Sequence, residues 1–261
     1  MPLLLLASCV SEVDWPRDKV TSGEGSFSLS LSTGELNAEV ETRSDGEKTY
    51  RTLTATEAAG YKVTLSHEGE TLWGPKALRE VSDRDRTQPQ GSGYVVSAEN
   101  CTAAEAQTDW GQPRYKGESE FEVNDGETTQ VEVKCNMLNA GFCVVFDKSF
   151  TDRFPTTYAV TTNDERNLRF DAGNAAQFQD NTLQGGAIAY YNMDDDGKHT
   201  VALIVTGSDE WDRVRLVKDI VLESGKLYRL LVRVGEENGK IGLSITYDSD
   251  FVVDELEILV E

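Results

Sequence analysis

The chain has 261 residues and enough apolar material to build a packed core. Hydrophobic residues make up 38% of it, among them nine Tyr, nine Phe and four Trp, which excludes wholesale disorder. A net charge of −21 repels nucleic-acid phosphates and anionic bilayer surfaces, so nucleic acid is not an expected partner. Beyond residue 9, no apolar run approaches the roughly 18 residues that a membrane-spanning helix needs.

Residues 1–9 resemble a bacterial lipoprotein signal that ends in Cys9. Four leucines at 3–6 precede Ala7 and Ser8, whose small side chains let a peptidase approach the backbone. Cys9 supplies the thiol that would receive a diacylglycerol and become the mature N-terminus. The apolar run is shorter than the roughly 7–15 residues of a secretory segment, and no basic residue precedes it. We predict an outer-membrane lipoprotein facing the periplasm or the cell exterior, with the lipid as its only membrane attachment; the alternative is an incidental cysteine.

The first half of the chain is predicted to contain a polar tether followed by a series of strands. Residues 10–25 are polar and predict a tether between the lipid and the first strand. From there apolar side chains fall on every other position, which is typical of half-buried β-strands. The alternation is clearest at 27–31, 61–65, 121–123 and 131–133. Glycine-containing turns separate these segments, and 56–59 and 103–106 each suit one turn of helix. We therefore expect residues 26–137 to form an antiparallel β-sandwich.

The second half repeats this organisation. Further strands are predicted at 142–146, 158–162, 187–191, 201–205, 227–234, 241–247 and 252–260. The predicted boundary lies at 136–139, so residues 138–261 would form a second sandwich. A connection this short should hold the two domains nearly end to end as a rod. The fold class predicted for the whole chain is all-β, with two tandem antiparallel β-sandwich domains.

Cysteines and acidic residues leave two questions open. Cys101, Cys135 and Cys143 allow at most one disulfide, and their spacing does not show whether any pair lies within bridging distance. Residues 192–197 match the first six positions of a calcium-binding loop, with Asp194 and Asp196 as weak metal candidates. Position twelve of that loop is Leu203, which cannot ligate calcium, so a hairpin turn with exposed carboxylates is the favoured interpretation.

Three segments together resemble a known family. They are the strand 93–98, the stretch 113–123 with its Pro-x-Tyr-x-Gly element, and the strand 131–135. In these segments the chain is similar to the N-terminal domain of a family of Bacteroidetes surface lipoproteins of unknown function, related to the fimbrillin-like pilins and adhesins. The likeness continues through 144–160 into the second domain, so it covers most of residues 26–261. It implies transthyretin-like or Ig-like sandwiches, export as a lipoprotein, and a role in adhesion or pilus assembly.

The resemblance also implies a processing site. Such pilins lose an N-terminal strand after cleavage at an arginine, and a strand from the next subunit then fills the groove by main-chain pairing. Arg43, in a polar turn, is the candidate for that cleavage; an ordinary exposed turn arginine is the alternative. The stretch 252–260 would be either a donor strand for a neighbour or the last strand of its own sheet.

No enzyme motif occurs in the chain, and we expect neither catalysis nor a cofactor. Trp73 and Tyr115 are expected to anchor the core, whereas Trp110 and Trp211 are candidates for stacking on a ligand such as a sugar ring. The leading hypothesis is a non-catalytic, lipid-anchored surface protein of adhesion or fimbrial assembly, whose partners are other subunits or surface ligands. The alternative is a glycan-binding surface lipoprotein.

Overall fold

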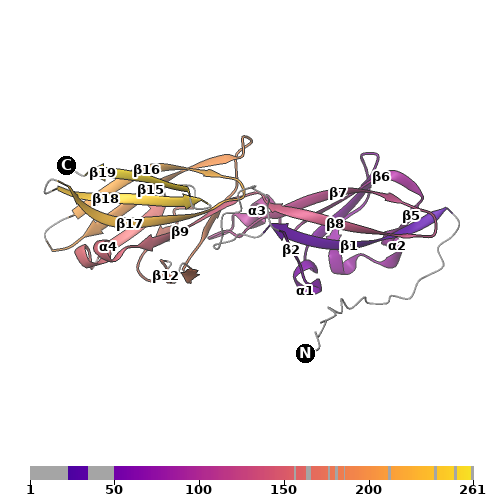
Figure 1. Cartoon of the computed structure of the whole chain (residues 1–261), viewed down its shortest axis with the longest axis horizontal. Helices are drawn as coiled ribbons and strands as arrows, with labels where there is room; N and C mark the ends of the chain where they lie inside the picture. Colours follow the sequence, from indigo (N-terminus) through magenta and orange to yellow (C-terminus); the bar gives the residue numbers. More distant parts are fainter. Residues whose placement is uncertain are drawn as a thin grey trace, which may run out of the picture.

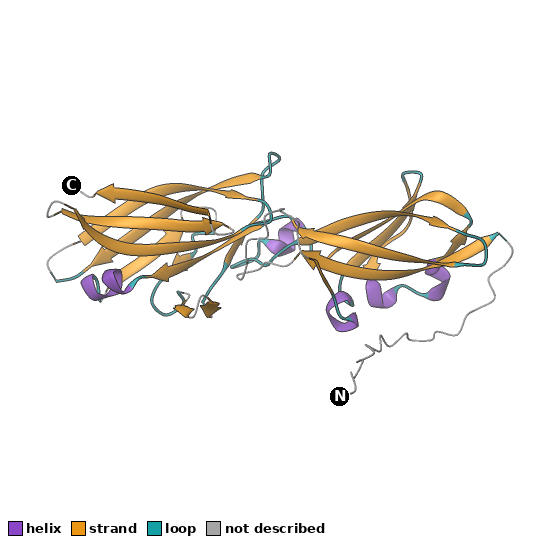
Figure 2. Ribbon diagram, viewed as in Figure 1, coloured by secondary structure: helices purple, strands orange, loops and turns teal. Residues whose placement is uncertain are grey.

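The computed structural model describes residues 23–34, 50–155, 157–162, 166–175, 177–179, 182–184, 186–210, 213–237, 240–249 and 252–259. It consists of two β-sandwiches arranged end to end along the longest axis (Figure 1). The helices are short, and the longest described one, α4, has six residues, so none of them has the length to span a bilayer. Strands account for almost all the regular structure (Figure 2).

The N-terminal sandwich contains eight strands. Its elements are β1 (Glu24–Gly34), β2 (Tyr50–Thr52), α1 (Ala55–Ala58), β3 (Lys62–His67), β4 (Glu70–Ala77), the 3-10 helix η1 (Leu78–Glu80), α2 (Asp83–Arg86), β5 (Thr87–Pro89), β6 (Gly91–Glu99), α3 (Ala103–Ala106), β7 (Tyr115–Val123) and β8 (Thr128–Met137). The strand order is β2-β1-β8-β7-β6-β3-β4, with β5 on the edge of β1. Strands β7 and β8 pair only at their junction ends, which lets the sheet fold over into two layers.

Period-two patterning explains which side chains fill this sandwich. The residues facing inward from β1, β3, β6, β7 and β8 are buried and form one apolar cluster, whereas their neighbours face solvent. The largest fully buried side chains of the cluster are Phe27, Leu31 and Leu65. Trp73 and Tyr115 pack against its margin, as predicted for core anchors.

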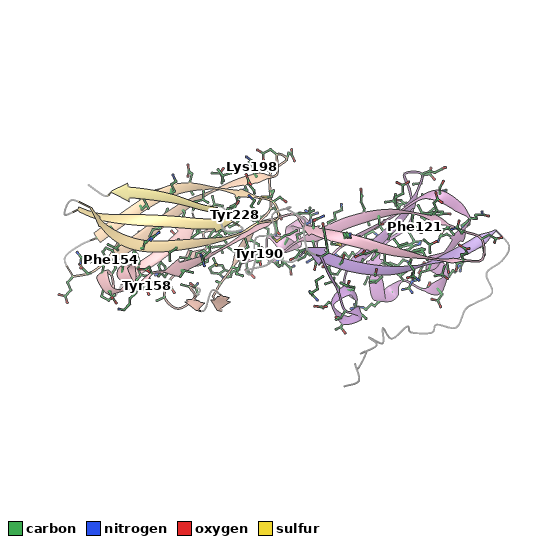
Figure 3. All side chains as sticks on the ribbon, viewed as in Figure 1. Phe121, Phe154, Tyr158, Tyr190, Lys198 and Tyr228 are labelled. Atoms are coloured by element: carbon green, nitrogen blue, oxygen red, sulfur yellow. The ribbon has the colours of Figure 1, made fainter. Side chains whose placement is uncertain are left out.

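The C-terminal sandwich contains the remaining strands. Its elements are β9 (Ala140–Phe146), α4 (Lys148–Arg153), β10 (Thr157–Thr162), β11 (Arg169–Phe170), β12 (Gln177–Gln179), β13 (Thr182–Gln184), β14 (Ala189–Tyr191), β15 (Lys198–Ser208), β16 (Arg213–Glu223), β17 (Leu227–Glu237), β18 (Lys240–Ser249) and β19 (Val252–Leu259). One layer has the order β11-β10-β15-β16 and the other β14-β9-β17-β18-β19. A second apolar cluster, rich in aromatic rings, lies between them. Figure 3 shows Phe154 of this cluster in the C-terminal sandwich and Phe121 of the first cluster in the N-terminal one.

The two sandwiches share one pairing scheme. In each, the first strand pairs in parallel with a much later strand, β1 with β8 and β9 with β17. In each, the start of that first strand also pairs antiparallel with a short strand, β5 or β14. The facing layer is β4-β3-β6-β7 in one sandwich and β11-β10-β15-β16 in the other. The C-terminal sandwich differs by adding β18 and β19 beside β17.

The predicted all-β sandwich class is confirmed, and the structure adds parallel strand pairing, which the sequence did not predict. The β1–β8 and β9–β17 pairs are parallel, although the turns indicated only antiparallel neighbours. Hairpin turns fix the direction of strands that follow each other, but about a hundred residues separate the partners in β1 and β8, so no turn defines their pairing.

Candidate functional site at the junction of the two sandwiches

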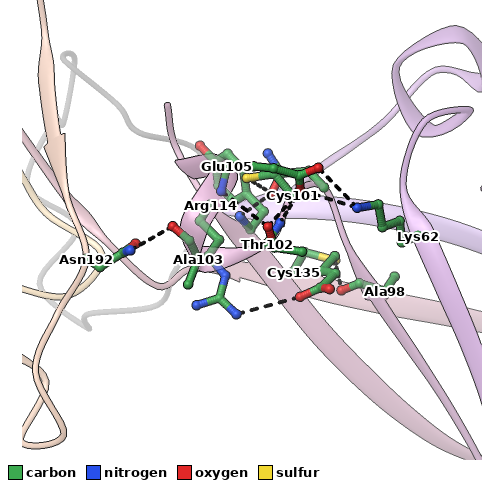
Figure 4. Close-up of polar contacts among 12 residues, drawn as sticks. Lys62, Ala98, Cys101, Thr102, Ala103, Glu105, Arg114, Cys135 and Asn192 are labelled. Carbon is green, nitrogen blue, oxygen red and sulfur yellow. Dashed lines mark hydrogen bonds and ion pairs between the residues drawn. The ribbon is translucent and has the colours of Figure 1, made fainter. Parts of the chain in front are cut away.

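The segment between β6 and β7 carries α3 and extends toward the C-terminal sandwich. Thr102 caps α3: its hydroxyl accepts a bond from Glu105 N, and its own backbone N donates to Glu105 Oε2 at 2.7 Å. Lys62 Nζ lies 3.3 Å from the same carboxylate and ties α3 to β3 (Figure 4). The Thr102 backbone and side-chain bonds, followed by the Lys62 bond, lower the pKa of Glu105 from 4.5 to about 2.

Asn192 connects the C-terminal sandwich to α3. Its Nδ2 donates to Ala103 O at 2.8 Å (Figure 4) and to Gln107 Oε1, also at 2.8 Å. Asn192 directly follows β14, so the end of that strand is held against α3. Both acceptors belong to the N-terminal sandwich, and the amide thereby joins the two parts across the junction.

Trp110 crosses the junction through packing. Its ring meets Phe170 of β11 edge-on, with the centroids 4.9 Å apart, and it packs against the core of the C-terminal sandwich. Its carbonyl oxygen accepts a bond from Tyr190 N at 2.8 Å. Gly111 follows in a left-handed conformation with φ of 78°. A Cβ there would lie 2.7 Å from Ala106 O and 2.8 Å from Tyr190 O, so only glycine fits this approach of two backbones.

Arg166 fixes the same contact from the other side. Its Nη1 donates to Asp109 O at 3.0 Å and its Nη2 to Tyr190 O at 2.5 Å. The guanidinium carbon lies 4.0 Å from the centroid of the Tyr191 ring, a cation–π contact. Burial raises the pKa of Tyr190 to about 12, which keeps this tyrosine neutral. One arginine therefore binds both backbones that meet at the junction.

The linker itself is anchored by Asn139, which is 1% exposed. Its Oδ1 accepts a bond from Arg114 N at 2.9 Å, and its Nδ2 donates to Gln112 O at 2.8 Å. Its carbonyl oxygen accepts a bond from Gly225 N at 2.9 Å. Residues 112–114 lead into β7 and residue 225 leads into β17, so Asn139 bonds to both sandwiches.

The predicted site residues are not gathered in one place. Cys9, Arg43 and Trp211 lie outside the described residues. Trp110 lies at the junction, where its ring packs on Phe170; this contact makes it part of the connection between the sandwiches. The strands that flank Trp211, β15 and β16, pair at Ser208 and Arg213 at the end of the sandwich far from the junction.

Asp194 and Asp196 lie in the turn between β14 and β15. These strands belong to different layers, so the connection crosses the sandwich and the expected hairpin is wrong. Lys198 N donates to Asp196 Oδ1 at 3.0 Å, and His199 Nδ1 lies 3.6 Å from Asp194 Oδ2. Within the described ranges, no group of three or more His, Cys, Asp or Glu side chains is placed to hold a metal ion.

The three cysteines of the described chain are free thiols. Cys101, Cys135 and Cys143 are buried and unbridged. Burial raises the pKa of Cys135 and of Cys143 to about 11, so both stay protonated at neutral pH. A protonated thiol is a poor nucleophile and a poor metal ligand. We therefore interpret the buried cysteines as core residues with no reactive role.

Sequence reasoning missed the residues that form the junction. Arg166, Asn192 and Asn139 lie in loops, and the calcium-loop match that begins at Asn192 did not point to a contact between the sandwiches. Their partners are mostly backbone carbonyl and amide groups, which any residue type provides and which leave no trace in the sequence. The one available signal was the short linker at 136–139, which requires polar side chains to satisfy the backbone groups that two adjoining sandwiches bury.

The fold and its junction define a tandem β-sandwich protein with two layers in each domain. Residues 23–261 match the family described as Domain of unknown function (DUF4493), and the chain belongs to that family. This match confirms the predicted membership in a family of unknown function. No curated protein matches the chain significantly.

Solved structures with a similar arrangement come from Bacteroides and Parabacteroides species. A candidate cell adhesion protein from Bacteroides eggerthii is 12% identical, with 85% of this chain and 90% of that chain covered and a TM-score of 0.42. A fimbrial assembly protein from Parabacteroides distasonis is 13% identical, with 92% and 99% covered and a TM-score of 0.36. A candidate polysaccharide-binding protein from Bacteroides thetaiotaomicron is 11% identical, with 87% and 97% covered and a TM-score of 0.45.

Proposed function

We propose that the chain is a non-catalytic surface protein, tethered by a lipid on Cys9, in which the N-terminal sandwich is a stalk and the C-terminal sandwich is presented for adhesion or fimbrial assembly. The domains would span 26–137 and 138–261. The observation that carries this proposal is the polarity of the rod. The start of β1 lies at the end of the N-terminal sandwich far from the junction, beside the β7–β8 turn (Figure 1).

This polarity would place the proposed lipid and the C-terminal sandwich at opposite ends. Strands β1 and β8 run side by side from the tethered end to the junction, and β9 and β17 continue in the same direction. The bonds of Asn139, Arg166 and Asn192 supply a stiff connection between the halves. A surface on the far sandwich would then stand clear of the membrane instead of lying against it.

The test is metabolic labelling of the full chain with radiolabelled palmitate in a bacterial host. The expected result is a labelled protein in the outer-membrane fraction, and an unlabelled, soluble protein for Cys9→Ala. Ser11→Ala serves as the matched control and should keep the label. An unlabelled wild-type chain would overturn the proposed tether.

Assembly by strand exchange is the finer form of this proposal. Cleavage at Arg43 would detach β1, whose Phe27 and Leu31 are almost fully buried, together with the proposed lipid on Cys9. It would open the β8 edge to a strand from another subunit, which would then hold the processed chain in the assembly. The backbone of β19 pairs with β18 over eight residues in its own sheet, so a donor strand from that end would first have to leave it. Limited trypsin treatment should yield polymers from wild type and none from Arg43→Gln if this mechanism operates.

Glycan binding is the second candidate function, with Trp211 as the stacking residue. The observation in its favour is the position of the flanking residues, which end β15 and begin β16 at the free end of the rod. Because the ring of Trp110 already packs on Phe170, Trp211 is the better platform. Binding on a glycan array that is lost in Trp211→Ala and kept in Trp73→Phe would support this function.

A further inference from the structure

The edge strand β16 has an unusual combination of length, regularity and exposed apolar side chains. It pairs with β15 over eleven consecutive residues without a bulge, and it ends the layer β11-β10-β15-β16. Val217 and Val221 are each 49% exposed and lie on its outer face. A long, flat edge strand presents a row of backbone donors and acceptors that can pair with another strand.

Several other strands with open edges carry features that oppose such pairing. Strands β2 and β5 have three residues each, and β11 has two. Strand β4 contains Pro75, and its register against β3 shifts twice. On β7, past Lys116, which pairs with β8, the exposed outer residues are Glu118, Glu120 and Glu122, which would meet one another if two copies paired. These are usual means by which native proteins block edge association, whereas β16 is long, free of proline and bulges, and carries charges of both signs.

The charges on the outer face of β16 are divided between its two ends. Arg213 and Arg215 are exposed near its start, and Asp219 is exposed after Val217. In the part of the chain that the structure describes, none of these three charged groups forms a salt bridge. Antiparallel pairing with an identical strand would bring the basic end of one copy opposite the acidic end of the other.

We propose that β16 pairs antiparallel with β16 of a second copy of this chain, about a two-fold axis at Val217. In this register Val217 contacts Val217 of the other copy. Arg215 of each copy lies opposite Asp219 of the other, so the interface contains two such pairs. Arg213 then lies opposite Val221, and its alkyl stem covers that side chain. Lys218, half-buried on the inner face, lies opposite Leu216 in the same way. The layer of four strands becomes a continuous layer of eight.

This pairing determines how two rods are oriented. Strand β16 runs from the free end of the C-terminal sandwich to the junction, where the next residue, Ser224, donates from its Oγ to Leu138 O at 3.0 Å. It lies roughly along the long axis (Figure 1). Antiparallel strands therefore place the two N-terminal sandwiches at opposite ends of the dimer. Resting on the proposed lipid tether, this arrangement would connect two facing membranes, so that the protein adheres to itself.

The pairing is tested by sedimentation equilibrium of the full chain with Cys9→Ser, which removes the proposed acylation point. The expected result is a monomer–dimer equilibrium that Val217→Lys weakens at least roughly tenfold, because two lysines then meet at the axis. Leu72→Lys is the matched control: Leu72 is 46% exposed on β4 and its replacement should leave the equilibrium unchanged. Circular dichroism verifies that each variant folds.

A charge exchange tests the register. Arg215→Asp alone should weaken the dimer, because it places two carboxylates opposite each other, and the double variant Arg215→Asp/Asp219→Arg should restore it. A chain that stays monomeric up to its solubility limit would overturn the proposal, and so would a dimer that neither Val217→Lys nor Arg215→Asp affects. If the chain dimerises as expected but is not labelled with palmitate at Cys9, the β16 pairing stands and only the proposed lipid tether is overturned.

Discussion

The side chain of Asn139 and the backbone of Arg114 are joined by a 2.9 Å hydrogen bond at the point where the chain passes from one sandwich to the next. The same amide donates to Gln112 O. Asn139 thus continues the backbone pairing of these segments, in which Leu138 N donates to Arg114 O at 2.8 Å. Its burial means that water cannot substitute for these bonds.

Removing this amide should destabilise the protein. Asn139→Ala removes the hydrogen-bond partner of the part-buried Arg114 N–H and of the Gln112 carbonyl, and we expect a total loss of about 1–3 kcal/mol. Urea unfolding followed by tryptophan fluorescence measures the change. The exposed Asn124→Ala is the control and should stay within about 0.5 kcal/mol of wild type. Equal stability of the two variants would show that the linker bonds do not contribute.

Gly111→Ala should be among the more damaging single substitutions. The residue has a φ of 78°, and the new Cβ would lie under 3 Å from two backbone oxygens. Gly197→Ala separates the two effects, since Gly197 has a φ of 76° and a Cβ added there would meet nothing within 4 Å. Gly197→Ala should lower the free energy of unfolding only by the cost of placing alanine in a left-handed conformation, about 1–2 kcal/mol. Gly111→Ala should lose clearly more in the same urea titration, and identical losses would argue against a tight junction.

Acid should weaken the capping of α3. The pKa of Glu105 is about 2 in the folded chain, against an ordinary 4.5. Because the pKa is lower in the folded chain, the ionised Glu105 carboxylate stabilises the fold. This stabilisation is fully present above pH 4.5 and is lost as the pH falls toward 2. In Glu105→Gln, stability should therefore fall less steeply over this pH range than in wild type. Denaturant midpoints measured from about pH 6 to about pH 2 test this expectation, with Glu122→Gln as the control; curves of equal slope would contradict it.

The buried thiols should be inert in the folded protein. Burial holds the pKa of Cys135 and Cys143 at about 11, and the thiolate is the form that reacts with alkylating reagents. Iodoacetamide at about pH 8 should modify neither residue until denaturant is added, as measured by peptide mass spectrometry. Rapid modification of either residue in native protein would mean that its part of the core opens.

Strand periodicity was sufficient to identify most of the sandwich, but β16 was missed. Apolar residues occupy both faces of this strand: Val214, Leu216, Ile220 and Leu222 face inward, and Val217 and Val221 face outward. The charged Lys218 at an inward position further hides the alternation. Strand β16 could be recognised only once β15 was seen to need a partner along its whole length.

The amino-acid sequence alone determined that the chain is all-β and where most strands and the linker lie, because alternation and turn residues are local properties of neighbouring positions. Only the tertiary structure decided which strands pair in parallel, which edge remains open, and how Asn139, Arg166 and Asn192 join the halves. Those outcomes depend on contacts between residues far apart in the chain, often with backbone groups that every residue carries, so no local pattern encodes them.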